Sequence, residues 1–154
     1  FARCYSLKNV KFSKNVYCIE SVAFQGCTSL TNIDLPDKLS EIGSNAFQCC
    51  TSLQTIDVPS KVSIIESWTF DGCKSLEIVN LPEDLIKIGD GAFRDCVSLE
   101  RINVYDECDY IADNAFDGCD KLTICGMKGS YAEQYAKKHN IPFEKLDTTI
   151  QSVN

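Results

Sequence analysis

The sequence has few of the residues and segments on which several large classes of protein depend. It contains 154 residues, a length that fits one domain, and its longest apolar run is the four residues Val16–Ile19. A membrane-spanning helix needs about 20 such residues, so none is expected. Lysine and arginine number 15 against 22 aspartates and glutamates, a net charge of -7. That charge would repel nucleic-acid phosphates, so a nucleic-acid partner is not expected.

The sequence also lacks the arrangements that most catalytic and cofactor sites require. Its single histidine, His139, offers no convincing Ser-His or Cys-His pair. There is no glycine-rich phosphate loop and no Cys-x-x-Cys pair, so neither zinc nor another metal is expected. Carboxylates are plentiful, but none stands in a context that indicates a cleft. We therefore expect a protein that is not an enzyme and that uses no cofactor.

What the sequence has in abundance is a repeat of 23 residues. Phenylalanine recurs at this spacing, with cysteine three residues later and leucine six residues later. The three series are Phe1, Phe24, Phe47, Phe70, Phe93, Phe116; Cys4, Cys27, Cys50, Cys73, Cys96, Cys119; and Leu7, Leu30, Leu53, Leu76, Leu99, Leu122. An isoleucine also lies five residues before each later phenylalanine. A unit this short cannot bury its own apolar face, so stacked units should turn these positions into continuous internal ladders.

Each unit is expected to contribute one short strand and one turn. The segment Leu30–Leu35 ends in alternating apolar and polar residues, which is typical of a half-buried strand, and Pro36 ends the pairing. In the other half of the unit, Ile42–Phe47 has glycine, serine and asparagine ahead of Ala-Phe. This order favours a turn leading into a short helical or 3₁₀ segment. Neighbouring strands would stack about 4.8 Å apart.

The pattern Ile-Gly-x-x-Ala-Phe-x-x-Cys-x-Ser-Leu-x-x-Ile-x-Leu-Pro is almost complete over 42–59 and again over 65–82. It resembles the BspA-like class of leucine-rich repeats, and the resemblance covers about residues 1–126. It implies a right-handed leucine-rich-repeat solenoid with a parallel sheet on one side, and turns and short helical segments on the other. Cys125 and Met127 depart from the pattern, because they stand where the last strand should have aliphatic residues.

The same resemblance carries an expectation of location and partner. Members occur mostly in large surface or secreted proteins of bacteria and some protists, where they serve in adhesion and protein binding. The implied location is therefore the cell surface or the exterior. The implied partner is a protein or peptide ligand, with host extracellular proteins among the candidates.

After the sixth unit the period fails, and a C-terminal cap is expected. Ser130–Glu133 has the pattern of a capping box, which predicts a helix over about 130–139. The segment 141–146 is expected to add a last strand that covers the open edge of the stack. The predicted organisation is six repeats over 1–126, the first incomplete at its N-terminal side, a cap over 127–146 and a polar tail over 147–154. Since Phe1 begins inside a unit, we expect the native protein to continue upstream.

Ten cysteines raise the question of disulfides. Six belong to the repeat, where we expect small buried free thiols, because parallel side chains on stacked coils seldom reach a disulfide dihedral of about 90°. Cys18 and Cys49 stand at positions that other units fill with charged residues or glycine. These two are expected to be exposed, and any reactive cysteine should be one of them.

The outward residues of the predicted strands, which we call the strand face, form the candidate binding surface. Its ligand-binding candidates are Thr55, Asp57, Ile78, Asn80, Arg101 and Asn103. Two interpretations stay open: a solvated face with side-chain amides bonded along the stack, or a ligand surface anchored by Ile78 and Arg101. Trp68 is a further large aromatic residue that either anchors a ligand or lies over a neighbouring coil.

The predicted function is therefore a non-catalytic interaction or adhesion module that binds a protein or peptide on the strand face. The alternative is a passive structural stalk that spaces another domain from the cell. A binding module should show a localised apolar or charged patch on the strand face, and a stalk should not.

Overall fold

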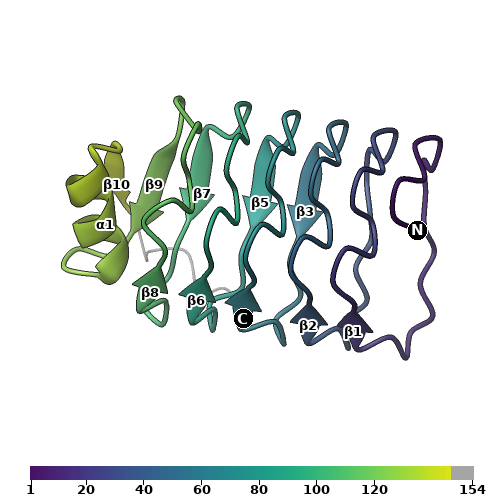
Figure 1. The fold of residues 1–154 in the computed structure, drawn as a ribbon. Helices are drawn as coiled ribbons and strands as arrows, with labels where there is room; N and C mark the ends of the chain where they lie inside the picture. The colour runs from purple at the N-terminus through teal and green to yellow at the C-terminus, as the bar shows by residue number, and fades with distance from the viewer. Residues whose placement is uncertain (147–154) are drawn as a thin grey trace.

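Each 23-residue unit folds into one coil of a solenoid, and successive coils lie side by side along the molecule (Figure 1). The computed structural model describes residues 1–146. We number the coils 1 to 6 by the phenylalanine at which each begins, from Phe1 to Phe116. The predicted fold class, a solenoid with a parallel sheet and a C-terminal helix, is confirmed. The predicted polar tail, 147–154, lies outside the described residues.

One side of the solenoid carries a five-stranded parallel sheet in the order β10-β9-β7-β5-β3. Its strands are β3 (Thr55–Asp57), β5 (Ile78–Asn80), β7 (Arg101–Asn103), β9 (Thr123–Gly126) and β10 (Phe143–Lys145). Coils 3 to 6 therefore contribute the predicted strand, whereas the segment 30–35 of coil 2 is not a strand. Coil 2 is still joined to coil 3 there, because the Gln54 N–H donates to the carbonyl of Thr31 at 3.1 Å.

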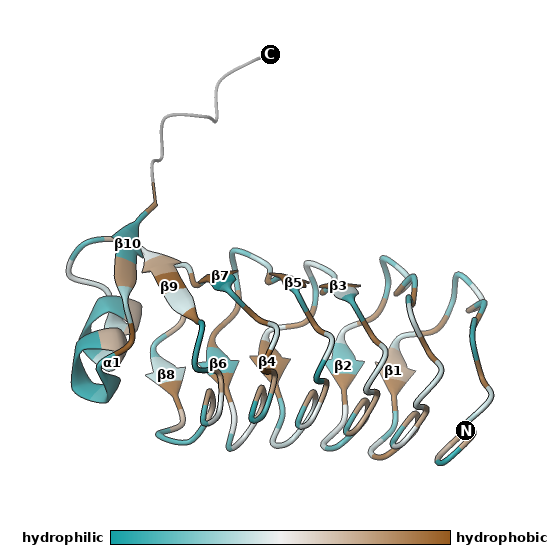
Figure 2. Ribbon diagram, turned by 90° about the horizontal axis from the view of Figure 1, so that it is seen from above, coloured by the Kyte–Doolittle hydropathy of each residue, from teal (hydrophilic) through white to brown (hydrophobic). Residues whose placement is uncertain are grey.

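The other side carries five strands of two residues each, which lie in one row (Figure 2). They are β1 (Cys18–Ile19), β2 (Glu41–Ile42), β4 (Ile64–Ile65), β6 (Lys87–Ile88) and β8 (Tyr110–Ile111). β1 pairs with β2, and β4, β6 and β8 form a three-stranded sheet, all in parallel. We call the outward side chains of this row, together with the residue just before each strand, the second face.

After each of these strands the chain follows consecutive turns. In coil 2, the Ala46 N–H donates to the carbonyl of Gly43 at 3.1 Å, and in coil 3 the Cys50 N–H donates to that of Phe47 at the same distance. Asn45 and Cys49 have left-handed backbones, with φ of 60° and 58°, and a left-handed residue interrupts a right-handed helix. Consecutive turns therefore take the place of the predicted short helical segments.

The phenylalanine ladder forms the centre of the core. The rings of coils 1 to 6 stack face to face, with 5.3 to 5.5 Å between successive ring centres. Phe47, Phe70 and Phe93 are completely buried, whereas Phe1 is 69% exposed. The cysteine, leucine and isoleucine positions of the central coils are buried around the same rings. This bears out the expectation of internal ladders.

The last coil is one residue shorter than the others. Arg101 pairs with Thr123 and Ile102 with Ile124, so the spacing is 22 residues here. Ile124 takes the buried aliphatic position, and the expectation that Cys125 and Met127 fill the aliphatic positions of this strand is wrong. Cys125 instead pairs with Asn103 in the outward register, where it is nevertheless fully buried.

The helix α1 (Tyr131–His139) closes the end of coil 6. Ser130 caps it by accepting a hydrogen bond from the Glu133 N–H at 3.3 Å, while the Glu133 carboxylate accepts one from the Gly129 N–H. The buried ring of Tyr135 meets Phe116 edge-on at 6.1 Å and so ends the phenylalanine ladder. Together with β10, which pairs with β9, α1 covers the apolar edge of the last coil.

Candidate functional site

The structure brings the six predicted residues together on the outward side of three neighbouring strands. The members of the strand face are Thr55, Asp57, Ile78, Asn80, Arg101 and Asn103. Thr55, Ile78 and Arg101 pair in register and form one row across the sheet. Thr55 and Asn103 are half-buried, and the other four are exposed.

The second row of this face is bonded along the stack. The Asn80 side-chain amide donates to the Asp57 carboxylate at 2.5 Å, one coil away. This is the contact expected of a solvated face whose amides bond along the stack. Asp57 and Asn80 therefore have part of their hydrogen-bonding capacity occupied before any ligand arrives.

Arg101, in the first row, is held by the C-terminal cap. Its guanidinium donates to the Glu144 carboxylate of β10 at 2.5 Å. The side chains are 54% and 55% exposed, so this ion pair orients Arg101 more than it stabilises the fold. The hydrogen bond from Arg101 to Glu144 also raises the pKa of Arg101. Glu144 was not predicted from the sequence, because it lies in β10, outside the repeat and 43 residues from Arg101.

Ile78 and Arg101 line a hollow of about 490 Å³ at the edge of the strand face. Its remaining lining residues are Glu77, Ser98, Glu100 and Lys121. Glu77 and Glu100 occupy the same position in neighbouring coils, and no ion pair engages either carboxylate within residues 1–146. Ile78 is 50% exposed beside them. Glu77 and Glu100 were not predicted from the sequence, although both stand directly after a repeat leucine, and that shared position could have indicated them.

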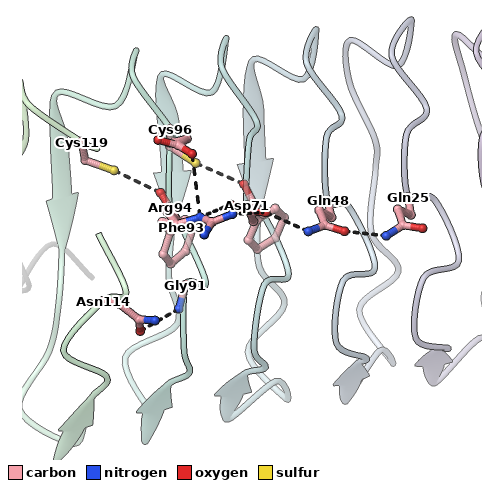
Figure 3. A network of polar contacts seen from close by, with 11 residues as sticks. Gln25, Gln48, Asp71, Gly91, Phe93, Arg94, Cys96, Asn114 and Cys119 are labelled. Atoms are coloured by element: carbon pink, nitrogen blue, oxygen red, sulfur yellow. Dashed lines mark hydrogen bonds and ion pairs between the residues drawn. The ribbon is translucent and has the colours of Figure 1, made fainter. Parts of the chain in front are cut away.

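A separate polar network crosses the turns between coils 2 and 5 (Figure 3). The Gln25 side-chain amide donates to that of Gln48, and Gln48 donates to the Asp71 carboxylate at 2.8 Å. On the other side, the Arg94 guanidinium donates to Asp71 at 2.8 Å. Asp71 is only 4% exposed, and these contacts compensate the burial of its charge. The network is satisfied internally and holds adjacent coils together.

Trp68 lies over the neighbouring coil. Its ring covers Gly91, where an added Cβ would lie 2.4 Å from two ring atoms, so this position of coil 4 requires glycine. The Arg94 guanidinium stacks 4.6 Å from the centre of the Trp68 ring. Of the two interpretations of Trp68, the structure supports packing between coils.

The repeat cysteines form a second internal ladder. From Cys27 to Cys119, each repeat thiol donates to the carbonyl of the phenylalanine one coil upstream, as from Cys50 to Phe24 at 3.1 Å and from Cys96 to Phe70 at 3.2 Å. Burial raises the pKa of the Cys50 thiol to about 12. All ten cysteines are free, as expected for those of the ladder. The hydrogen bonds from the ladder thiols to the phenylalanine carbonyls, which a methyl group could not make, were not predicted.

The cysteines expected to be exposed differ from each other. Cys49 is exposed, whereas Cys18 is half-buried. Burial raises the pKa of the Cys18 thiol, and the nearby carboxylates of Glu41 and Glu20 raise it further. Cys4 belongs to the buried register but is exposed, since no coil covers its outer side. Among the cysteines named from the sequence, Cys49 is therefore the better candidate for reactivity.

Two further observations concern residues 1–146. No helix in this range is both long and apolar enough to span a bilayer. Nor does this range contain three or more histidine, cysteine, aspartate or glutamate side chains grouped so that they could hold a metal ion.

Comparison with known proteins agrees with the repeat. The family described as the BspA type leucine-rich repeat region matches residues 1–123 in six copies. A leucine-rich repeat protein from Bacteroides ovatus ATCC 8483 has a similar structure, with a TM-score of 0.61 and 30% identity over 77% of this chain and 39% of that chain. The leucine-rich repeat protein of T. pallidum has a TM-score of 0.69 and 32% identity, over 71% of this chain and 52% of that one. The chain thus spans about half or less of the length of these two proteins. No curated protein matches it.

Proposed function

Because the chain belongs to the BspA-type leucine-rich repeat family, we propose that it is a non-catalytic interaction or adhesion module of a bacterial surface or secreted protein. Repeats of this family generally serve as protein-interaction modules. On this proposal the ligand is a protein or peptide, and it binds on the strand face.

The observation that carries the proposal is the hollow around Ile78. An exposed isoleucine beside charged side chains combines an apolar contact with groups that can orient a ligand. Arg101 is presented at the rim of this hollow by its bond to Glu144. A ligand would therefore meet a side chain that is already positioned, which lowers the entropy cost of binding.

The charges of the hollow indicate the chemistry of the ligand. Glu77 and Glu100 engage in no ion pair within the described residues, and the whole chain has a net charge of -7. A peptide that places an apolar side chain on Ile78 and a lysine or arginine against these carboxylates would complement both features. Such binding should weaken as salt is added.

A passive stalk is the alternative. It is favoured by the contacts that part of the strand face makes within the molecule, namely Asn80 with Asp57 and Arg101 with Glu144. A stalk requires no open hollow and no exposed apolar side chain on this face. The hollow around Ile78 is the observation that supports binding over a stalk.

The proposal is tested with a display library of random peptides, followed by capture from serum and extracellular-matrix proteins. We expect enriched peptides to combine an apolar residue with a nearby lysine or arginine. The variant Ile78→Ala/Arg101→Ala should bind them about tenfold more weakly or worse. Ile86→Ala/Lys87→Ala is the matched control, because it removes an isoleucine and a cation from the second face. If the strand-face variant keeps full affinity, or if no peptide is enriched, the proposal fails.

A further inference from the structure

The second face carries a cluster of exposed apolar side chains that the proposed function leaves unused. Its outward residues, one from each strand, are Cys18, Glu41, Ile64, Lys87 and Tyr110. Ile64 is 36% exposed and Tyr110 45%, and Ile86, just before β6, is 48% exposed. The Lys87 ammonium lies 5.3 Å from the centre of the Tyr110 ring. By comparison, Ile78 is the one large apolar side chain exposed among the six strand-face residues.

The charged outward side chains of β2 and β6, the two strands that flank β4, are opposite in sign. Glu41 lies on β2, one coil before Ile64, and Lys87 lies on β6, one coil after it. The turns that lead into β2 and β6 repeat the reversal, because Lys38 precedes β2 and Asp84 precedes β6. All four side chains lie at or near the surface, and none of them takes part in an ion pair within residues 1–146.

We propose that the second face binds the second face of another copy of this chain, about a two-fold axis that runs along β4. Such an axis reverses the order of the coils, so the two solenoids lie antiparallel. Ile64 then meets Ile64 of the second copy, and Glu41 faces Lys87 of the second copy. Lys38 and Asp84 come to face each other in the same way. A two-fold contact uses one patch twice, which requires this kind of self-complementarity.

The order of the charges selects this arrangement over the other face-to-face dimer. An axis parallel to the solenoid would keep the order of the coils and place Glu41 on Glu41 and Lys87 on Lys87. Like charges that face each other across the contact oppose association. The pattern therefore specifies both the partner, which is a second copy, and its orientation.

The size of the second face sets the strength of the dimer. Five strands stacked about 4.8 Å apart span roughly 20 Å, and each strand is only two residues long. The contact area is therefore smaller than the about 800 Å² per partner that stable dimers bury. The dimer is therefore weak, and salt weakens it further. The strand face lies on the other row of strands and stays open (Figure 2). A dimer would thus present two ligand-binding faces at once.

One residue near the axis, in addition to Lys61 in the turn before β4, opposes the dimer and provides an independent test. Glu66 follows β4 by one residue and is half-buried, so the axis along β4 brings it close to Glu66 of the second copy. Removing this charge with Glu66→Gln should strengthen association. The same substitution would have less effect on the dimer whose axis runs parallel to the solenoid through Ile64, because Glu66 lies two residues along the chain from that axis.

The charge pairing is tested by sedimentation velocity of the 154-residue chain over rising concentration at low salt. We expect Glu41→Lys or Lys87→Glu alone to weaken dimerisation about tenfold, since each change introduces two repulsive contacts. The double variant Glu41→Lys/Lys87→Glu should return to within about threefold of the original chain, because it restores both pairs. A chain that stays monomeric at every concentration, or a double variant weaker than both single variants, overturns the proposal.

The axis is tested by cross-linking in a background with Cys4, Cys18 and Cys49 replaced by serine. Ile64→Cys should form a disulfide-linked dimer under mild oxidation, because the axis places this residue opposite itself. Glu41→Cys should not link to itself, but it should link to Lys87→Cys when the two variants are mixed. Thermal melting of each reduced variant confirms that it is folded. Self-linking of Glu41→Cys in preference to Ile64→Cys would overturn the proposed axis.

Discussion

The inward and outward side chains of β3, β5 and β7 differ in how closely their residue types follow the 23-residue repeat. The inward residues are Ile56, Val79 and Ile102, and all three are aliphatic and at most 4% exposed. Their outward neighbours, Thr55, Ile78 and Arg101, have no chemistry in common. Two adjacent positions on the same strand are therefore under different constraints.

The difference follows from what each position contacts. An inward residue packs against its equivalents in the coils on both sides, so a change in one coil affects two interfaces. An outward residue meets solvent and contacts surface side chains, such as its neighbours in the row or Glu144 beside Arg101. The interior thus maintains the solenoid, while the strand face is free to acquire a ligand.

Removing the cap should have the largest effect. A chain that ends at Gly126 loses α1 and β10, which exposes the apolar edge of coil 6, including Phe116. We expect it to aggregate, because solenoids depend on terminal caps for solubility. Light scattering and thermal melting provide the measurement, with a chain that ends at Leu146 as the control. A chain ending at Gly126 that is monomeric with unchanged melting would show that the cap does not protect the core.

Within the ladder, the effect of a truncation should depend on whether a coil lies on each side. Phe70 is completely buried between Phe47 and Phe93, so Phe70→Ala should lower the free energy of unfolding by about 3–5 kcal/mol. Phe1 is 69% exposed and stacks on Phe24 alone, so Phe1→Ala should cost much less. Urea denaturation of both variants measures the difference. Equal shifts would contradict a core built by stacking.

The cysteine ladder predicts a loss of stability at alkaline pH. Burial raises the pKa of Cys50 and Cys119 from 9.0 to about 12, so the folded chain holds these protons more tightly than the unfolded chain. The contribution of these thiols is complete below about pH 8 and is lost progressively as pH rises from about 9 towards about 12. The variant Cys50→Ala/Cys119→Ala should show a shallower fall in urea-denaturation titrations. An unchanged slope would mean that these thiols ionise equally in both states.

Labelling with a thiol reagent compares the interior and the surface directly. We expect Cys49 to react readily and Cys50, Cys73 and Cys96 to react slowly in the folded chain, since burial limits both access and ionisation. Mass spectrometry of the labelled peptides gives the order of reaction. Rapid labelling of Cys73 without unfolding would place it outside the core.

The solenoid could be predicted from the sequence because its interior repeats at a fixed spacing. The phenylalanine, cysteine and leucine series specify which residues face inward, and the structure buries them in coils 2 to 6. The one-residue shortening of coil 6 was missed, because Cys125 and Met127 match the 23-residue count and only the pairing of Arg101 with Thr123 reveals the shift. The left-handed residues that replace the short helical segments were missed as well. Arg3, Val22, Cys49 and Trp68 are not residues that favour this conformation.

The strand face was predictable as a set of residues but not as a set of contacts. The 23-residue register places Thr55, Ile78 and Arg101 side by side, as found. It does not reveal that Glu144 holds Arg101, because β10 lies outside the repeat. Nor does it show that Trp68 packs on Gly91, since that contact depends on the ring conformation as well as on the register. Contacts between repeated and unrepeated segments require the structure.

The most direct test of this division measures melting and ligand binding on the same variant. Ile78→Ala/Arg101→Ala changes two outward side chains of the strand face and leaves the ladder untouched. We predict a melting temperature close to that of the original chain, together with loss of binding to the peptides that the original chain selects. A variant that still binds them with full affinity, or one that melts as early as Phe70→Ala, would contradict the separation of a structural interior from a binding strand face.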